Sequence, residues 1–520
     1  MLLYLLAFAL FSFALYNLLF HPLAGIPGPL GSRTGLWSWK STRAVKRDMG
    51  WKLLELHKKY GTVVRIARNE VSVCERAPKT HLTRPRFKKP LKKTEFYDAL
   101  RDLDGPNLLS TLDNKSHTEM RRAESAAYSL TKMQSEFEGS VQAACGEFLA
   151  LLDRRIAAME GKATLDLGEA IQFFAMDVVG RMVLGKSFGL CAGEDRRGWV
   201  PLVERILEMS CFLGTQPFLL PFVRWASRSQ GADMMCEADR CSNRFNSDPF
   251  REMFMQAKNA DGSVFSRDQV RAAVYVSSFF EELIRNLTLG RGLTLGTGSD
   301  LILSSPQKTM RAMIRYIVGN VRFPPVIYDK VQAEIESALV VFPLSYEDAC
   351  KLVYFQACLK ETLRLHPPIP WPLPRTVAAG GLLLSGNHFL AEGTQVSMSP
   401  FVVHRQIEAF GSDAGEFRPE RWLEADETHL LEMERKLLAF GAGPRVCIGK
   451  NIGLMEVFVV VPVLLWRYRI GFTTRSSEGP HRYRLGRDVD GKVGNDVPYF
   501  VTSQWAAVQR DFWCDLASRV

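Results

Sequence analysis

The chain has 520 residues, 47% of them hydrophobic and 23% charged, which is enough apolar material for a large core and too little charge bias for a disordered protein. Its ten cysteines show no paired spacings, which argues against the disulfide framework of a small secreted protein. The formal net charge of +10 is mild for this length and indicates a solvated basic surface rather than a nucleic-acid groove, so no nucleic-acid partner is expected.

Residues 1–20 carry no charged side chain and would span about 30 Å as a helix, enough to cross the core of a bilayer. They show neither the basic start nor the small-residue cleavage site of a secretory signal, so we interpret them as an uncleaved transmembrane anchor. Residues 21–40 open with HPLAGIPGPLG, whose prolines and glycines predict a stiff hinge. The positive-inside rule places the rest of the chain in the cytosol, because basic residues follow the anchor on this side: Arg33, Lys40, Arg43, Lys46 and Arg47.

Helical periodicity dominates the chain after the hinge. Apolar residues recur every three or four positions in several segments, among them residues 49–61, 116–130, 147–160 and 350–365. Strand-like runs are short and lie at residues 62–74 and 380–399, with turn residues between them. The sequence therefore predicts a mainly α fold with small β-sheets. No internal repeat or composition shift divides residues 41–520, so we expect one catalytic domain there.

The segment KETLRLHPP contains a pair of opposite charges. Glu361 and Arg364 lie three positions apart on one helical face, where they can pair. Further along, FRPERW supplies Arg421. Taken alone, a Glu-x-x-Arg pair is usually part of a solvated helix face.

Residues 440–449 read FGAGPRVCIG and set one cysteine in a stiff loop. A single cysteine with no second ligand at metal spacing argues against structural zinc, which takes four protein ligands. Haem needs one, and a thiolate on haem iron pushes electron density toward dioxygen and favours cleavage of the O–O bond. We therefore predict that Cys447 is the axial ligand of a haem iron.

The neighbours of this cysteine suit that role. Gly443 and Gly449 would let the backbone approach the porphyrin and the sulfur. The apolar run at residues 452–466 predicts a buried helix that starts near the cysteine, where its N-terminus favours a thiolate. We expect Arg445 to pair with a haem propionate and Phe440 to shield the sulfur. The alternative is a surface turn with an incidental cysteine, but five positions match Phe-x-x-Gly-x-Arg-x-Cys-x-Gly together, with a chance of about one in ten thousand in this chain.

The loop resembles the haem-ligating signature of the cytochrome P-450 monooxygenases. The Glu361 and Arg364 pair and the segment Pro-Glu-Arg-Trp around Arg421 occur in that family's order, and the resemblance covers nearly the whole chain after the anchor. It implies the P-450 fold, haem b (iron protoporphyrin IX) as cofactor, and a structural charge network in which Arg421 locks with Glu361 and Arg364 behind the haem. More loosely, the chain resembles the filamentous-fungal group that contains pisatin demethylase and benzoate para-hydroxylase.

The resemblance also implies further site residues. Arg121 and Arg375 match the family's other contacts to the haem propionates, and His117 takes the place of a common tryptophan. Trp371 and Leu373 lie in a segment that commonly lines the substrate pocket, with core packing as the alternative.

The pattern breaks in the long central helix that crosses the haem in this family. There an acid is followed at once by an alcohol, and the two deliver protons for oxygen activation. In this chain Gly298, Ser299 and Asp300 match, but Leu301 stands where the alcohol should be. We also expect Pro306 to disrupt a helix that should be continuous.

Two interpretations of this break stay open. Residues 301–307 could be foreign to the natural chain, such as retained intron sequence, because the pattern aligns when these seven residues are replaced by three. Alternatively, the sequence is taken at face value, with Asp300 as the acid and Thr309 or Ser304 as the alcohol near the site but poorly placed for catalysis.

The resemblance implies a microsomal enzyme that inserts one oxygen atom of O₂ into a small apolar organic substrate by hydroxylation, epoxidation or demethylation. Electrons would come from NADPH through a separate NADPH-cytochrome P-450 reductase, with cytochrome b5 as a second candidate donor. The expected place is the endoplasmic reticulum membrane, spanned once, and the expected role is fungal secondary metabolism or detoxification. The alternatives are a non-oxygenating isomerase or dehydratase and an uncoupled or inactive haem-binding product, both motivated by Leu301, and a membrane scaffold with an incidental motif.

Overall fold

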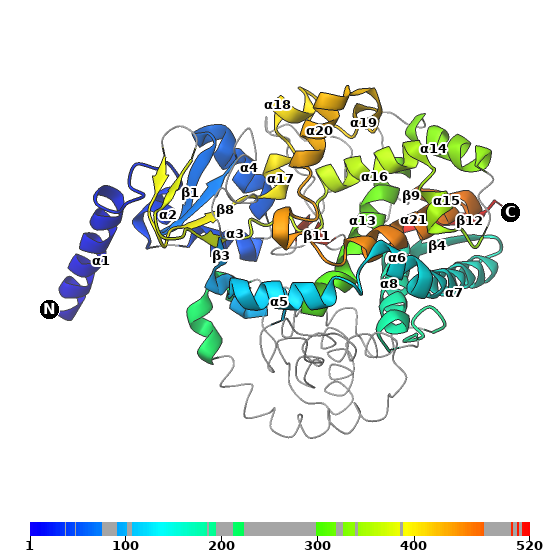
Figure 1. Cartoon of the computed structure of the whole chain (residues 1–520), viewed down its shortest axis with the longest axis horizontal. Helices are drawn as coiled ribbons and strands as arrows, with labels where there is room; N and C mark the ends of the chain where they lie inside the picture. The colour runs from blue at the N-terminus through cyan, green and yellow to red at the C-terminus, as the bar shows by residue number, and fades with distance from the viewer. Residues whose placement is uncertain are drawn as a thin grey trace, which may run out of the picture.

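A computed structural model describes most of the chain, which is mainly helical with small sheets, as the sequence predicts (Figure 1). The described residues are 1–36, 38–46, 48–74, 91–100, 107–184, 187–193, 212–222, 298–318, 326–338, 342–384, 388–472, 501–502, 507–508 and 512–519.

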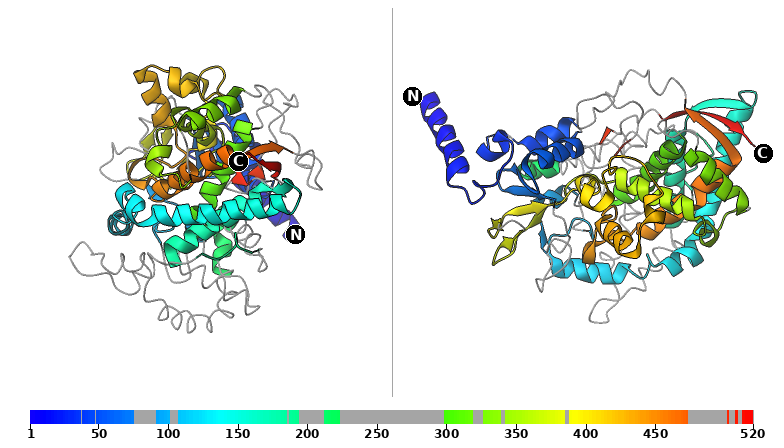
Figure 2. Two further views of the ribbon diagram at one scale, coloured as in Figure 1. Left: turned by 90° about the vertical axis from the view of Figure 1, so that its right-hand side faces the viewer. Right: turned by 90° about the horizontal axis from the view of Figure 1, so that it is seen from above.

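The N-terminal part consists of four helices: α1 (Leu2–Leu19), α2 (Leu30–Thr34), α3 (Trp39–Lys46) and α4 (Met49–Tyr60). The first of them is apolar and projects from the body of the molecule in both Figure 1 and Figure 2. Across the described residues, none of the helices has the length and apolar character that crossing a membrane requires. The anchor expected at residues 1–20 is thus not confirmed, and the predicted hinge at residues 21–40 contains α2 and the start of α3.

A five-stranded sheet follows these helices and draws on distant parts of the chain. Its strand order is β1-β2-β8-β5-β3, with β2 parallel to β8 and the other neighbours antiparallel. The strands are β1 (Val63–Ala67), β2 (Glu70–Val73), β3 (Lys92–Lys93), β5 (Arg375–Thr376) and β8 (Gln395–Ser397). A separate hairpin joins β6 (Leu382–Leu383) to β7 (Phe389–Leu390), so both strand-rich segments predicted from the sequence are confirmed.

The helical body holds the remaining elements. In chain order up to the middle of the chain they are η1 (Glu95–Leu100), α5 (Asn114–Glu124), α6 (Leu130–Lys132), the π-turn η2 (Met133–Phe137), α7 (Glu138–Ala157), β4 (Lys162–Asp166), α8 (Leu167–Leu184), η3 (Pro217–Leu219) and α13 (Gly298–Val318). Then follow α14 (Val326–Ser337), α15 (Tyr346–Ala349), α16 (Val353–Leu365), α17 (Pro400–Val403), α18 (Ile407–Phe410), α19 (Arg421–Glu424), α20 (Glu427–Lys436), η5 (Gly443–Arg445) and α21 (Lys450–Arg467). The C-terminal strands are β9 (Tyr468–Phe472), β10 (Val501–Thr502), β11 (Ala507–Val508) and β12 (Trp513–Ser518); β12 lies between β4 and β9 in a second sheet.

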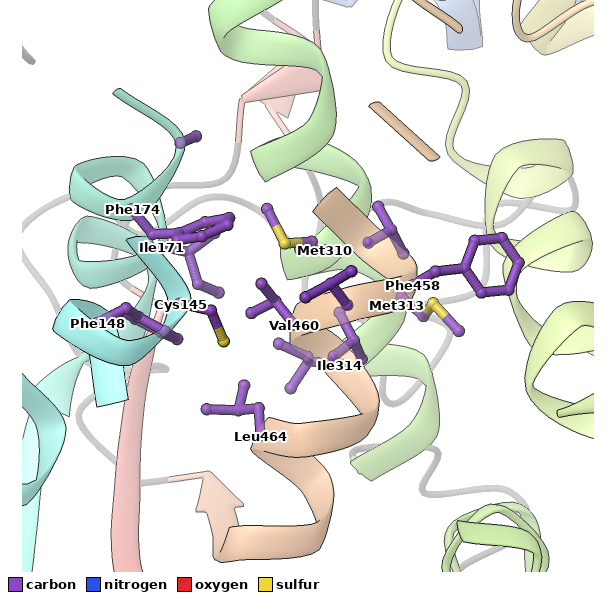
Figure 3. Close-up of a cluster of buried hydrophobic side chains, with 14 of the residues drawn as sticks. Cys145, Phe148, Ile171, Phe174, Met310, Met313, Ile314, Phe458, Val460 and Leu464 are labelled. Atoms are coloured by element: carbon purple, nitrogen blue, oxygen red, sulfur yellow. The ribbon is translucent and has the colours of Figure 1, made fainter. Parts of the chain in front are cut away.

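The main core forms where α13 and α21 pack against α7 and α8 (Figure 3). Met310 and Ile314 of α13 face Val460 of α21, and Cys145 and Phe174 approach from α7 and α8. Because α21 is apolar on all sides, it is buried along most of its length. This burial fixes α21 in the core, whereas its first residues and the cysteine loop before it lie at the edge of that core and are partly exposed.

The central helix α13 differs from the sequence-based expectation at Pro306. It runs unbroken from Gly298 to Val318 with Pro306 inside it, so the predicted disruption is wrong. A proline removes one backbone hydrogen bond and crowds the preceding turn, but tertiary packing can offset this cost of about 3 kcal/mol. Here the proline ring packs on Gly453 of α21, where an added Cβ would lie 3.4 Å from its Cγ.

Candidate active site

The cysteine loop is a closed turn between α20 and α21. The backbone N–H of Cys447 donates to the carbonyl oxygen of Phe440 at 2.8 Å, which closes the loop on itself. Gly441 and Gly443 have φ angles of 72° and 68°, in the left-handed region that strains other residues. The need for glycine at position 443 therefore comes from the backbone of the turn itself.

Cys447 is presented by the start of α21. That helix begins at Lys450 after the cap residue Gly449, and the backbone N–H of Gly449 donates to the thiol. Burial raises the pKa of Cys447, and the Gly449 N–H, Arg121 and Lys450 offset part of this rise. A coordinated metal would deprotonate the thiol outright, since a bound cation outweighs such local effects.

Cys447 is accessible from outside the protein. Of the seven cysteines within the described part of the chain, only Cys447 is exposed. A ligand can therefore reach this residue, although the protein atoms around the thiol raise its pKa. In the described ranges no three His, Cys, Asp or Glu side chains come together as a metal site, so this thiol would be a single protein ligand.

Five basic residues form a cluster beside the loop, which we call the basic cluster. Its members are Lys93, His117, Arg121, Arg375 and Arg445. The strand pair β3–β5 places Lys93 directly opposite Arg375. Burial, followed by the charges of Arg445 and Arg375, lowers the pKa of Lys93 to about 6. Burial and the same kind of cationic neighbours lower the pKa of His117 to about 3.

Arg445 has an incomplete set of partners within this cluster. Its Nη2 donates to Oδ1 of Asn114, whereas its Nε and Nη1 are buried without a hydrogen-bond partner in the described structure. Arg375 donates to the hydroxyl of Tyr97 and to the carbonyl oxygen of Pro374 at 2.9 Å. A buried guanidinium with open donors among other cations calls for an anion with several oxygen atoms.

The basic cluster therefore fits the two propionates of haem. No carboxylate of the described residues forms an ion pair with any of its five members. Arg121 also ties the cluster to the cysteine loop, because its Nη1 donates to the carbonyl oxygen of Val446 at 2.6 Å. The thiol and the cations thus lie in one site, which is the arrangement that a porphyrin with one axial thiolate requires.

The predicted charge network is present as a buried unit. Glu361 and Arg364 are 0% exposed and form a two-point pair, with Nη2–Oε1 and Nε–Oε2 distances of 2.7 and 2.8 Å. Nε of Arg421 lies 2.9 Å from Oε1 of Glu361. Burial opposes ionisation of Glu361, but pairing with Arg364 and Arg421 outweighs it and lowers the pKa of the carboxyl. Trp422 completes the unit, because its Nε1 donates to Oε2 of Glu361 at 2.9 Å.

Of the residues of α13 expected as acid and alcohol, Asp300 and Thr309 lie far apart along the helix. Asp300 is in the first turn of the helix and Thr309 is nine positions later, about two and a half turns away along one axis. Thr309 is 5% exposed, on a helix that packs against α21. The family's consecutive acid and alcohol therefore have no counterpart in this pair.

The two residues expected in the substrate pocket differ in their surroundings. Trp371 is 1% exposed, packs within the main core, and has Nζ of Lys40 6.0 Å from its ring centroid. This arrangement fits the core-packing alternative for Trp371. Leu373 is partly buried at the edge of the same core, as is Phe440, so their contacts with substrate and sulfur stay predictions.

Several residues of the site were missed by the sequence analysis. Lys93 reaches the basic cluster through the pairing of β3 with β5, and Tyr97 reaches it through the turn η1. No local sequence pattern predicts either position. Asn114 could have been found, because it lies on the same helix as His117 and Arg121 at spacings of three and seven. Trp422 directly follows Arg421 in the quoted segment, so its place in the charge network had a visible signal as well.

Comparison with known proteins agrees with this geometry. The family model "Cytochrome P-450" matches residues 300–483. A cytochrome P-450 monooxygenase of Aspergillus terreus is 31% identical over 481 residues, which are 86% of this chain and 90% of that protein. The monooxygenases cicH and pkfB of Emericella nidulans are 29% and 30% identical, over 91% and 86% of this chain and 93% and 86% of their own lengths. The chain therefore belongs to the cytochrome P-450 family, the monooxygenases that bind haem b.

Proposed function

We propose that this monooxygenase is held at the endoplasmic reticulum membrane by residues 1–20, with its catalytic body in the cytosol, and inserts one oxygen atom of O₂ into a small apolar organic substrate. The reaction would be a hydroxylation, an epoxidation or a demethylation. Electrons would come from NADPH through NADPH-cytochrome P-450 reductase, with cytochrome b5 as a second donor. The substrate would belong to fungal secondary metabolism or to detoxification.

The observation that carries the proposal is the thiol of Cys447 at the start of α21, with the N–H of Gly449 directed at it. When bound, haem b would supply the iron at which dioxygen is activated, and the thiolate of Cys447 as its ligand would favour O–O cleavage. Gly449 and the N-terminus of α21 stabilise negative charge on the sulfur. Arg445 and the other members of the basic cluster would hold the propionates and so fix the position of the group.

The membrane part of the proposal is supported by residues 1–20 and by the basic residues that come after them in the chain. The helix α1 has 18 residues, no acidic residue in its first turn and no basic residue in its last. Large apolar side chains on it are exposed, for example Leu3 at 79% and Phe8 at 70%. An exposed apolar surface of this kind marks a membrane or protein contact, and the basic residues lie on one side of it in the sequence.

The substrate class is inferred from the relatives. The monooxygenases of Aspergillus terreus and Emericella nidulans are fungal proteins, and they match most of this chain. Their similarity supports a fungal oxidation of an organic molecule but selects no particular compound.

A second candidate function follows from α13. Because Asp300 and Thr309 are nine positions apart, the helix offers no consecutive acid and alcohol at these residues to deliver protons. A haem-thiolate protein without this pair would consume oxygen without oxidising substrate, or would catalyse an isomerisation or a dehydration that needs no oxygen. Both alternatives keep the site around Cys447.

The test is a comparison of cofactor consumption with product. The full chain is combined with NADPH-cytochrome P-450 reductase in phosphatidylcholine vesicles, and NADPH and O₂ consumption are compared with oxidised product over a panel of apolar organic compounds. Product in proportion to NADPH supports the proposed monooxygenase reaction. Oxygen consumption that yields only peroxide supports the uncoupled alternative, and conversion of a substrate without NADPH supports an isomerase or dehydratase.

A further inference from the structure

The junction between α1 and the five-stranded sheet is built around one buried arginine. Arg65 of β1 is 0% exposed, and its guanidinium reaches the end of the apolar helix. Nη1 donates to the carbonyl oxygen of Asn17 at 2.9 Å and lies 3.4 Å from that of Leu23. Nε and Nη2 donate to the carbonyl oxygen of Arg68 at 3.1 and 2.7 Å. One side chain thus binds α1, the segment after it and the β1–β2 turn together.

The guanidinium of Arg65 donates its hydrogen bonds to backbone carbonyl oxygens. Within the described residues no carboxylate forms an ion pair with Arg65. Burial, with the charges of Arg33 and Arg68, lowers the pKa of Arg65 to about 10, so the guanidinium stays charged at neutral pH. The last carbonyls of a helix lack partners inside it and carry its negative dipole end, which favours a cation there. Removing the side chain would leave the Asn17 carbonyl buried without its donor.

Further contacts hold the segment after α1 on the same strand. The backbone N–H of Arg65 donates to the carbonyl oxygen of Pro27 at 2.8 Å. A Cβ added to Gly28 would lie 2.1 Å from the Arg65 carbonyl oxygen, so only glycine fits there. Ser32 of α2 donates to the carbonyl oxygen of Ile66 at 2.8 Å. The residues that join α1 to the body are therefore packed against the sheet.

We infer that Arg65 fixes α1 at one angle to the sheet, so that α1 and the exposed apolar residues beside it meet a phospholipid bilayer as one surface. These residues are Phe20, Leu30 and Leu36, which are 71%, 68% and 49% exposed. The inference rests on the membrane attachment proposed above. A bilayer is the fitting partner because the apolar surface continues along α1, while the exposed Arg68 beside it suits anionic headgroups.

The test measures the angle directly in the full chain. Non-canonical amino acids are introduced at two positions and labelled with nitroxides by click chemistry. The positions are Phe8, which is 70% exposed on α1, and Lys58, which is exposed on α4. Native cysteines stay untouched in this scheme. Pulsed electron resonance then gives the distribution of label distances in detergent and in nanodiscs of phosphatidylcholine, with and without phosphatidylserine. A single narrow distribution is expected in every condition, and a broad one in the wild-type chain overturns the inference without any variant.

Two matched variants test whether the side chain of Arg65 fixes the angle of α1. Arg65→Gln removes the charge and most of the carbonyl contacts, and a broadened distribution is expected while the spectrum of the reduced, CO-bound protein stays unchanged. Arg68→Gln removes an exposed arginine whose guanidinium lies 5.7 Å from the Phe13 ring, and it should keep the narrow distribution. An Arg65→Gln chain with the wild-type distribution contradicts the assignment of Arg65.

Flotation with vesicles distinguishes a failure of the fixed angle from a failure of the proposed membrane attachment. A chain that floats with the vesicles but shows a broad distribution overturns the fixed angle and leaves the membrane attachment standing. A chain that does not float, or that instead self-associates through α1, overturns the membrane attachment and with it the bilayer as partner.

Discussion

Glu361 and Arg364 form a two-point ion pair that is entirely buried, and Arg421, sixty positions later in the chain, approaches the same carboxylate at 2.9 Å. The network of these three residues joins α16 to α19 and the loop before it. Its members are 0%, 0% and 3% exposed, and Arg421 also pairs with Asp413 at 3.0 Å. Each of these buried charges therefore depends on its partners for compensation.

Breaking this network should destabilise the protein strongly. In Glu361→Gln the buried Arg364 loses its counter-charge and Arg421 keeps only Asp413, at 3.0 Å, which should cost about 3–5 kcal/mol of unfolding free energy. The matched control is Glu434→Gln, which breaks the half-exposed pair of Glu434 with Lys360 on the same helix α16. An exposed pair contributes about 0–1 kcal/mol, so this variant should unfold close to the wild type. Denaturant unfolding of both variants checks the difference, and equal midpoints would contradict a structural role for the network.

A methyl group at Gly443 should strain the cysteine loop. Its φ of 68° lies where an L residue is disfavoured, so Gly443→Ala should lose about 1–2 kcal/mol of stability and release haem faster. Gly139 serves as the control, because it lies in α7 with no atom near an added Cβ. Gly139→Ala should gain about 0.5–1 kcal/mol through helix propensity. Thermal unfolding and transfer of haem to apomyoglobin measure both effects, and a Gly443→Ala protein as stable as the wild type would contradict the strained turn.

Haem binding should take up a proton at Lys93. Burial and the charges of Arg445 and Arg375 lower its pKa to about 6, so above this pH the folded chain without haem holds it neutral, whereas propionates beside it would favour the charged form. The bound state then carries more protons than the free state, and haem affinity should fall as pH rises from about 6, by at most about tenfold per pH unit from this group.

Haem titrations between pH 6 and 9 measure this slope. Lys93→Met should flatten it and weaken binding, and Lys93→Arg should flatten it while keeping most of the affinity, because a guanidinium stays charged. Lys58→Met, at an exposed position on α4, is the control and should keep the wild-type slope. An unchanged slope in Lys93→Met would remove Lys93 from the propionate site.

Much of this site could be predicted from the chain because its central parts are local. Cys447, Gly443 and Arg445 lie within five residues, and Glu361 and Arg364 are one helical turn apart. Spacing on one turn or one loop fixes which groups meet. Lys93, which sequence reasoning missed, reaches the site through the pairing of two-residue strands, and Tyr97 reaches it through the short turn η1. Elements this short leave almost no periodic signal.

One expectation failed for a different reason. The sequence predicts that Pro306 disrupts its helix, but in the structure the proline packs on Gly453 within an unbroken α13. Helix propensity is a local quantity, and here tertiary packing outweighs it. Trp371 is 1% exposed in the main core, which fits the core-packing alternative, and its contact with substrate stays a prediction.

The missing alcohol after Asp300 should make the coupling of NADPH consumption to product formation poor. As the chain stands, most electrons from NADPH should end in hydrogen peroxide rather than in product. Replacing residues 301–307 by Thr-Thr-Ser puts an alcohol directly after Asp300, and the share of NADPH that yields product should rise several-fold. Sequencing the transcript across residues 285–310 provides the complementary check. Equal coupling in both chains would contradict a role for this segment in proton delivery.

The central claim is that the thiol of Cys447 ligates the iron of haem b. The most direct measurement is the absorption spectrum of the reduced, CO-bound full chain, compared between the wild type and Cys447→Ala, with Cys350→Ala as a control at a half-buried cysteine of the surface. The wild type and the Cys350→Ala protein should show the red-shifted Soret band of a thiolate ligand, and Cys447→Ala should lose it. A thiolate band that survives Cys447→Ala, or a wild-type chain that takes up no haem, would contradict the account.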